Sequence, residues 1–104
     1  MVRRKDIEQE ILGYLKGLEA MGFPVHKAVL FGSMIKGNAH DYSDIDLAVW
    51  SPAFGDDYFE TIEKTAPLKR SFKRIELHPF RMIDVAENNP FIKEIISTGI
   101  EVAT

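Results

Sequence analysis

The sequence predicts a single α+β domain built on a small β-sheet. Apolar residues recur at helical spacing over residues 4–20, and two short β-type runs follow at His26–Phe31 and Asp44–Trp50. Helix-capping residues then frame another helix late in the sequence. A length of 104 residues fits one domain with a modest core and leaves no room for a second substrate-binding lobe. We therefore expect residues 1–104 to form one domain.

The first helix is predicted from an apolar stripe whose members recur every three or four positions. The stripe consists of Ile7, Ile11, Leu15 and Leu18, and Leu12 and Met21 are expected to widen it. Gly22 and Pro24 are expected to end this helix, since neither residue favours its continuation.

Two strands should follow, with a segment containing glycine and asparagine between them. In the second strand, side chains two residues apart share a face, because the side-chain period of a strand is two. One face then carries Asp44, Asp46, Ala48 and Trp50, and the other carries Ile45, Leu47 and Val49. We expect the aliphatic set to face the core and Trp50 to pack in the core or at its rim.

The next helix should begin at a capping aspartate, either Asp56 or Asp57. It is expected to continue through Phe59 and Ile62 and to end at Pro67, because proline lacks the N–H that an inner turn requires.

A third strand and a last helix complete the prediction. The segment Lys73–His78 alternates charged with aliphatic residues, which is typical of a strand with one buried face. Around PFIKEIIST, Asn89 fits an N-cap, Pro90 a first-turn proline and Gly99 a helix C-terminus.

Composition excludes several classes of function. The chain has no cysteine, so a disulfide framework, a thiolate zinc site and a cysteine nucleophile are all excluded. A formal net charge of -3 argues against direct DNA binding through phosphate neutralisation. Asp6, Glu8 and Glu10 interrupt the stretch that a signal peptide would need, and no apolar run approaches the length of a membrane helix. We expect a soluble, cytoplasmic protein.

The two aspartates of the second strand suggest a metal site. Two same-face aspartates have Cα atoms about 7 Å apart, so their carboxylates can converge on divalent cations. Alternatively, Asp44 and Asp46 form the solvated face of an edge strand. The preceding strand ends at Gly32 and Ser33, where a sharp turn, its backbone N–H groups and the Ser33 hydroxyl could bind phosphate. The two patterns together indicate a function more specifically than either pattern does alone.

The order of these features resembles the signature of the nucleotidyltransferases of the DNA polymerase β superfamily. Gly32 and Ser33 are followed, after ten residues, by Asp44, Ile45, Asp46 and Leu47. The longer stretch GSMIKGNAHDYSDIDLAV, including Gly37 and Ser43, is similar to the minimal nucleotidyltransferases, small prokaryotic proteins often encoded beside a helical HEPN-domain partner. The final NPFIKEIISTGIEV looks like their closing helix. The resemblance implies a palm-like fold, with a small mixed sheet flanked by helices.

The resemblance also implies a third carboxylate on a later strand. Glu76 is the first candidate, because it alternates with Ile75 and Leu77 and so leaves the face opposite to the core. Asp84 is the rival, in a less regular stretch, and a plain solvent-facing role for Glu76 remains an alternative. The family more often has aspartate at this place.

Other polar residues have two possible roles each. The family commonly has arginine where Lys36 stands, so Lys36 is expected either to contact a phosphate or to be solvated. The basic cluster Lys69, Arg70, Lys73 and Arg74 could guide a triphosphate or an acceptor, or it could be ordinary surface. His78 could contact nucleotide or metal, but we expect it to be structural or exposed. Tyr42 and Trp50 could stack on a base, but we expect both to pack in the core or at its rim.

The resemblance implies a reaction. ATP would lie with its phosphates at Gly32 and Ser33, and two Mg²⁺ ions would be held by Asp44, Asp46 and Glu76. AMP would pass to a hydroxyl while pyrophosphate leaves. The implied acceptor is a tyrosine of the paired HEPN toxin, which would make the chain an antitoxin in a homo- or hetero-oligomer.

Two alternatives belong to other classes. The chain could be a non-catalytic antitoxin that neutralises its toxin by binding it. It could instead be a small-molecule nucleotidyltransferase of the aminoglycoside type, completed by homodimerisation. Transfer of label from ATP to a partner protein, and its loss in aspartate variants, would discriminate between these functions.

Overall fold

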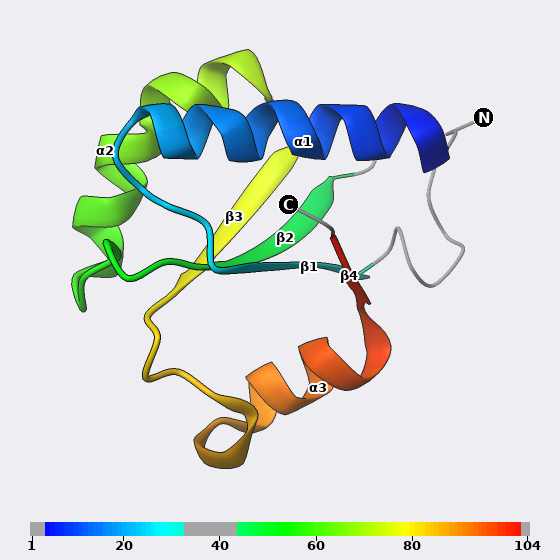
Figure 1. Ribbon diagram of the computed structural model, residues 1–104, viewed down its shortest axis with the longest axis vertical. Coiled ribbons are helices and arrows are strands. Elements are labelled where there is room, and N and C mark those ends of the chain that lie inside the picture. The colour runs from blue at the N-terminus through cyan, green and yellow to red at the C-terminus, as the bar shows by residue number, and fades with distance from the viewer. Residues whose placement is uncertain (1–3, 33–43, 103–104) are drawn as a thin grey trace.

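The computed structural model describes residues 4–32 and 44–102, and it confirms the α+β fold. Over these residues the elements are α1 (Arg4–Ala20), β1 (Lys27–Phe31), β2 (Ile45–Trp50), α2 (Tyr58–Ser71), β3 (Ile75–Phe80), a short 3₁₀ turn (Ala86–Asn88), α3 (Pro90–Thr98) and β4 (Ile100–Glu101). Helices α1 and α2 lie on one side of the sheet and α3 lies on the other (Figure 1). The predicted α1, β2, β3 and α3 agree with the structure to within about two residues at each end.

The sheet is mixed, as predicted, and its strand order is β3-β2-β1-β4. β1 runs antiparallel to both β2 and β4, whereas β2 runs parallel to β3. β2 is therefore an inner strand, and the hypothesis of an edge strand with a solvated acidic face is wrong. The inner position also means that both faces of β2 can be covered.

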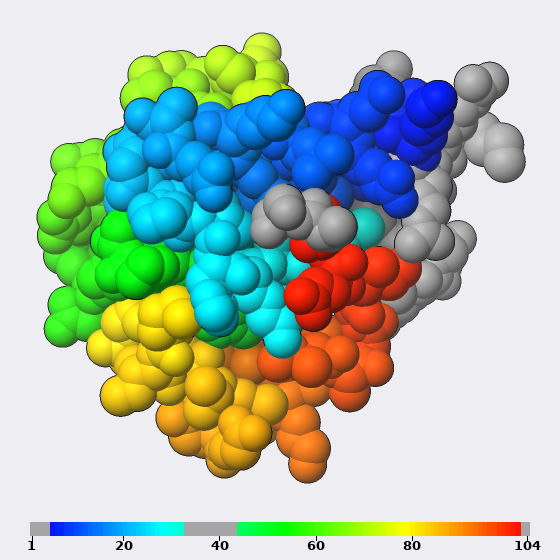
Figure 2. Space-filling view, in the orientation of Figure 1, coloured from blue at the N-terminus to red at the C-terminus, as the bar shows by residue number. Residues whose placement is uncertain are grey.

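Both faces of β2 carry buried side chains, although Asp46 is partly exposed. Ile45, Leu47 and Val49 face the core, as predicted, and the structure shows that α1 covers them there. On the opposite face, Ala48 is fully buried and Trp50 is 5% exposed, and both pack against α3 in a second cluster. The space-filling view shows α1 across the upper part of the molecule and α3 in the lower part (Figure 2). The sequence of β2 alone did not reveal that α3 would cover this face.

Helix α1 buries the predicted stripe but not its two outer members. Leu12 and Met21 are each 39% exposed, whereas Tyr14, which was not predicted, is 1% exposed. The helix ends through Gly22, whose φ of 93° is in the left-handed region, and the N–H of Phe23 donates to the carbonyl of Leu18. Glycine is favoured at this position because it adopts that conformation without strain.

Helix α2 begins at the predicted aspartate but does not stop at the predicted proline. The Asp57 side chain accepts a hydrogen bond from the N–H of Glu60 at 3.0 Å and so caps the helix. Pro67 lies inside the helix, which continues to Ser71, so the expected end was wrong. Beyond the proline, Leu68 and Phe72 pack against the main core, and this packing outweighs the cost of the proline.

Helix α3 agrees with its prediction. Asn89 accepts hydrogen bonds from the N–H groups of Phe91 and Ile92, Pro90 is in the first turn, and Gly99 is the C-cap. Ile92 is fully buried and contributes to the core beneath β2.

Strand β3 forms one edge of the sheet and carries two features that obstruct further pairing. Pro79 lies within the strand and has no N–H to donate. The Lys69 ammonium donates to the carbonyl oxygen of Ile75 at 2.9 Å.

Within residues 4–32 and 44–102, no helix is both long enough and apolar enough to cross a membrane.

Candidate functional site

Three strands bring the candidate site together on the face that α3 partly covers. Phe31 of β1 pairs with Asp46 of β2, and Asp46 pairs in turn with Glu76 of β3. Paired residues project from the same face of a sheet, so these three side chains form one row across the strands. We call Phe31, Asp46 and Glu76 the Asp46 row. The next row along the strands is Val29, Ala48 and His78.

Asp46 is the central and best-enclosed carboxylate of this row. Its side chain is 30% exposed. Oδ1 lies 3.3 Å from Nε2 of His78, and because a carboxylate only accepts, the imidazole nitrogen is the donor. Oδ2 lies beside Gly32, at the end of β1. The carboxylate is therefore fixed from two sides, one by a hydrogen bond and one by backbone packing.

Gly32 serves this arrangement in two ways. Its φ of 84° is in the left-handed region, which side chains other than glycine adopt only with strain. A β-carbon at this position would collide with Oδ2 of Asp46 and would approach Cγ to 3.2 Å. Sequence analysis explained this glycine only by a turn, and the structure adds that the glycine makes room for the carboxylate.

Glu76 and Asp44 are more open. The Glu76 side chain is 49% exposed, and its Oε1 is 2.9 Å from Nζ of Lys69 in α2. Asp44 is exposed and lies one residue before β2, so strand alternation does not extend to it as predicted. Among the residues that the structure describes, no three His, Asp or Glu side chains are grouped closely enough to hold a metal. The roles of Asp44, Asp46 and Glu76 as metal ligands remain predictions.

The rival carboxylate, Asp84, belongs to a different contact network. It accepts a hydrogen bond at 2.8 Å from the backbone N–H of Arg81 and also contacts the Arg81 guanidinium. Burial works to raise the pKa of Asp84, but the hydrogen bonds and charge of Arg81 outweigh it and lower that pKa. Asp84 follows the end of β3, whereas Glu76 is paired with Asp46 near its start. This placement favours Glu76 over Asp84 as the third acidic residue.

The remaining predicted nucleotide-binding residues, Ser33 and Lys36, lie outside the described residues, as do Gly37, Tyr42 and Ser43. Of the predicted phosphate turn, the structure therefore describes Gly32.

His78 contacts Asp46, which was not predicted from the sequence. It lies two residues beyond Glu76 on the same strand face, and its ring packs edge-on against Phe31 at a centroid distance of 4.9 Å. The alternation of RIELH already placed Glu76 and His78 on one face. The sequence did not indicate that the parallel pairing of β2 and β3 would bring this imidazole to Asp46.

The basic cluster spans the last turn of α2 and the residues that follow it, and two of its members stabilise the fold. The Arg74 guanidinium donates to the Glu10 carboxylate of α1, with Nη2 to Oε1 at 3.0 Å, and Lys69 holds Glu76 and two backbone carbonyls. Arg70 and Lys73 are exposed. Nearby, burial first and the charge of Glu76 second raise the pKa of Tyr14, so its hydroxyl stays protonated.

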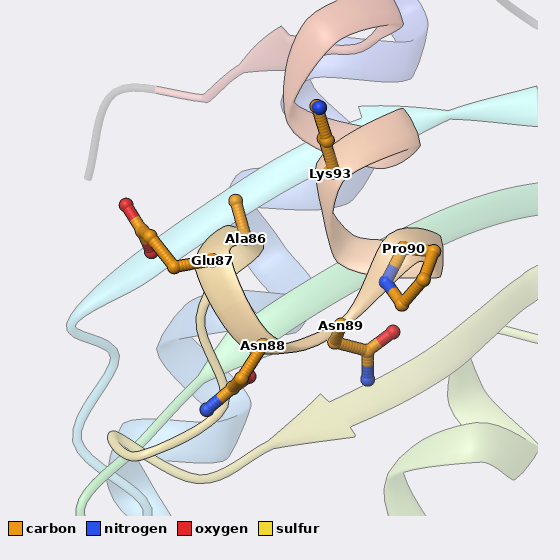
Figure 3. A pocket seen from close by; sticks show the side chains of 6 residues that line it. All are labelled: Ala86, Glu87, Asn88, Asn89, Pro90 and Lys93. Carbon is orange, nitrogen blue, oxygen red and sulfur yellow. The ribbon is translucent and has the colours of Figure 1, made fainter.

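A shallow pocket is lined by residues other than the candidate site residues discussed above. It has a volume of about 630 Å³ and is lined by Ala86, Glu87, Asn88, Asn89, Pro90 and Lys93. Figure 3 shows these side chains around the junction of the 3₁₀ turn and α3. None of them is a predicted site residue.

Comparison with known proteins now identifies the family. Residues 9–104 match the family described as "Polymerase beta, Nucleotidyltransferase". The chain belongs to this nucleotidyltransferase family. The predicted superfamily and its fold are thereby confirmed, although no curated protein matches the chain.

Solved structures share this nucleotidyltransferase fold at low sequence identity. A toxin-antitoxin with AMP-PNP is 22% identical with a TM-score of 0.61, and the match covers 92% of this chain and 72% of that chain. A putative nucleotidyltransferase from Sulfolobus solfataricus is 14% identical with a TM-score of 0.63, covering 90% and 77%. A mutant of the toxin-antitoxin MntA-HpeT is 18% identical with a TM-score of 0.57, covering 92% and 71%.

The donor chemistry of the candidate site fits a hard divalent cation. Asp46 and Glu76 present carboxylate oxygens from one row of the sheet, and Asp44 adds a third carboxylate two residues from Asp46. Magnesium prefers oxygen ligands and the chain has no thiolate to attract softer metals. Glu76 would have to exchange its contact with Lys69 for a metal contact.

Proposed function

We propose that this nucleotidyltransferase transfers AMP from ATP to a hydroxyl group of a partner toxin and thereby acts as an antitoxin. The observation that carries the proposal is the fixed Asp46 carboxylate, which lies beside the Gly32 bend and pairs in register with Glu76. A triphosphate at the bend would be adjacent to both carboxylates. Membership of the nucleotidyltransferase family supports this class of reaction.

The proposed site uses one divalent ion or two, with magnesium as the natural choice. Asp44, Asp46 and Glu76 would hold the metal, which neutralises phosphate charge and lowers the pKa of the attacking hydroxyl when bound. The Gly32 bend, with Ser33 and Lys36 following it in sequence, would bind the phosphates of ATP.

The chain's own residues then contribute mainly by position and charge. Phosphoryl groups carry negative charge throughout the transfer, so fixed groups that orient the α-phosphate toward the hydroxyl lower the barrier. No nucleophile from the protein is required, because the acceptor hydroxyl attacks and pyrophosphate leaves. Burial, and after it the charge of Glu76, raises the pKa of Tyr14 and keeps its hydroxyl protonated. This tyrosine is therefore unsuited to act as an acceptor.

The proposed partner is a toxin, specifically a HEPN-domain protein with a tyrosine as acceptor. Two of the structural neighbours are toxin-antitoxin structures, and one of them was solved with AMP-PNP, an analogue of ATP. The mutant name of the other neighbour records aspartate-to-glutamate changes at two positions two residues apart, the spacing of Asp44 and Asp46 here.

The proposal is tested with ATP labelled on the α-phosphate, Mg²⁺ and the co-encoded neighbour protein. We expect label on the neighbour with the wild-type chain, and loss of at least a hundredfold in the Asp46→Asn variant. Asp44→Asn and Glu76→Gln should each reduce transfer strongly. Asp84→Asn is the matched control, since Asp84 contacts Arg81 instead of Asp46, and its transfer should stay within about twofold of wild type.

The outcomes separate the competing functions. Neutralisation of the toxin without label, unchanged in Asp46→Asn, would contradict the enzyme and support a non-catalytic binding module. Label on an aminoglycoside in place of the protein would contradict the proposed acceptor. Equal loss in Asp84→Asn and Glu76→Gln would contradict the assignment of Glu76.

A further inference from the structure

The geometry points to His78 as a positioning residue that fixes the Asp46 carboxylate for metal and triphosphate binding. This inference rests on the proposed function, because it assigns the partner that orients the central acid of that site. It adds a residue outside the acidic set predicted from sequence.

The hydrogen bond itself is the first observation. Nε2 of His78 lies 3.3 Å from Oδ1 of Asp46, while Oδ2 is beside Gly32. A carboxylate on a short side chain can rotate about its terminal bond, and contacts at both oxygens restrict that rotation. A donor to one oxygen leaves the remaining lone pairs of the carboxylate in a defined direction for a cation.

The sheet explains why this histidine reaches that aspartate. His78 is in register with Ala48, one row away from Asp46. Ala48 carries only a methyl group and is fully buried, so it leaves the diagonal path from the imidazole to Asp46 open. A larger side chain at position 48 would separate the two groups.

Two aromatic rings hold the imidazole in place. His78 packs edge-on against Phe31 of the same face at 4.9 Å, and against Phe91 of α3 at 6.3 Å between ring centroids. The side chain of His78 is 33% exposed, so neighbouring groups cover most of the ring and restrain it. Phe91 thereby connects α3 to the site. The position of His78 is set by contacts from β1, β2 and α3.

The test compares His78→Phe with wild type by binding of Mn²⁺, followed by electron paramagnetic resonance of the free ion. Phenylalanine keeps an aromatic ring against Phe31 and Phe91 but lacks the nitrogen donor. We expect an unchanged melting temperature and a rise in the Mn²⁺ dissociation constant of roughly tenfold to a hundredfold. Transfer should fall by a similar factor, with the larger part in kcat if orientation is the cause.

His26→Phe is the matched control, because it makes the same substitution at an exposed histidine. It should leave Mn²⁺ affinity and transfer unchanged. A second measurement needs no metal: in ¹H–¹⁵N spectra of the imidazoles, the Nε2 signal of His78 should shift in Asp46→Asn and stay unchanged in Asp84→Asn.

The results distinguish this inference from the proposed function. If Asp46→Asn loses Mn²⁺ binding while His78→Phe binds like wild type, the positioning role is overturned and the proposed site survives. If Asp46→Asn binds Mn²⁺ like wild type, the proposed site itself fails, and the role of His78 fails with it.

Discussion

Oδ2 of Asp46 occupies the space that a β-carbon on Gly32 would need. The replacement Gly32→Ala should therefore impose two penalties: backbone strain at a φ of 84° and a collision with the carboxylate. We expect the free energy of unfolding to fall by about 2 kcal/mol or more. Mn²⁺ affinity and AMP transfer should fall as well, because Asp46 must move. Urea denaturation and metal titration measure the two effects separately.

Substitutions at two other glycines allow the effect of backbone strain to be measured apart from the effect of the collision. Gly22 has a φ of 93° but open space around it, so Gly22→Ala should lose about 1 kcal/mol of stability and keep metal affinity. Gly55 has neither constraint, and Gly55→Ala should be close to neutral. A Gly32→Ala variant that matched Gly22→Ala in both measurements would show that the contact with Asp46 has no consequence.

The ion pair between Glu10 and Arg74 should link the start of β3 to α1. Three donor–acceptor contacts between 3.0 and 3.2 Å join the guanidinium and the carboxylate, and both side chains are about three-quarters buried, at 26% and 24% exposed. A double-mutant cycle with Glu10→Ala and Arg74→Ala should give a coupling free energy of about 1 kcal/mol. Because the cycle cancels other contacts of each residue, it isolates this pair.

The exposed pair Glu60 and Lys64 is the control for that cycle. Its ions are 2.7 Å apart, but their side chains are 55% and 59% exposed. Solvent screens such a pair, so its coupling should be much weaker than that of Glu10 and Arg74. A coupling of equal size would mean that burial does not strengthen the Arg74 contact.

Asp84 should make stability depend on pH in the acid range. Although burial works to raise it, the hydrogen bonds and the charge of Arg81 hold the pKa of Asp84 in the folded protein below the ordinary value of an aspartate in an unfolded chain. The ionised carboxylate therefore stabilises the fold above the unfolded pKa, and this contribution is lost as the pH falls through the folded pKa. The stability difference between wild type and Asp84→Asn should be largest near neutral pH and shrink below about pH 4. A difference that grows on acidification would contradict the assigned direction.

The same measurement has a built-in probe. Trp50 is the only tryptophan of the sequence, and its indole N–H donates to the carbonyl oxygen of Asp84 at 2.7 Å. Its fluorescence should report both global unfolding and any loosening of the segment around Asp84. Arg81→Ala should weaken this pH dependence without abolishing it, because it removes the guanidinium contacts that lower the pKa of Asp84 but keeps the hydrogen bond from the backbone N–H.

Pro67 should reduce the stability of α2. Proline is about 3 kcal/mol less favourable than alanine inside a helix, and part of that difference is offset by its restriction of the unfolded chain. We expect Pro67→Ala to raise the free energy of unfolding by about 1 to 2 kcal/mol, measured by thermal or urea unfolding. Pro52→Ala, in an exposed turn, should give no such gain. Destabilisation by Pro67→Ala would mean that the ring makes a contact the helix needs.

The sequence predicted features that depend on neighbouring residues. Local rules of hydrogen bonding and periodicity predicted the cap at Asn89, a cap at Asp56 or Asp57, the end of α1 at Gly22 and the buried stripe of α1. The pairing of Glu76 with Asp46 was anticipated only as a shared face, and its register came from the structure.

Features that depend on distant elements were missed. Nothing near Ala48 and Trp50 indicates that α3 covers them, and nothing near Pro67 indicates that Leu68 and Phe72 anchor the helix beyond it. The contact of His78 with Asp46 was missed for the same reason, because it spans 32 residues and depends on parallel strand pairing.

The features of β3 also bear on how the protein behaves at high concentration. An uncovered sheet edge is a template on which other chains can add strands and grow fibres. Pro79 removes one donor from that template, and the Lys69 ammonium occupies the Ile75 acceptor. At the opposite edge, β4 offers only two residues. Both margins of the sheet are thus poor templates for aggregation, and the domain should stay monodisperse as its concentration rises.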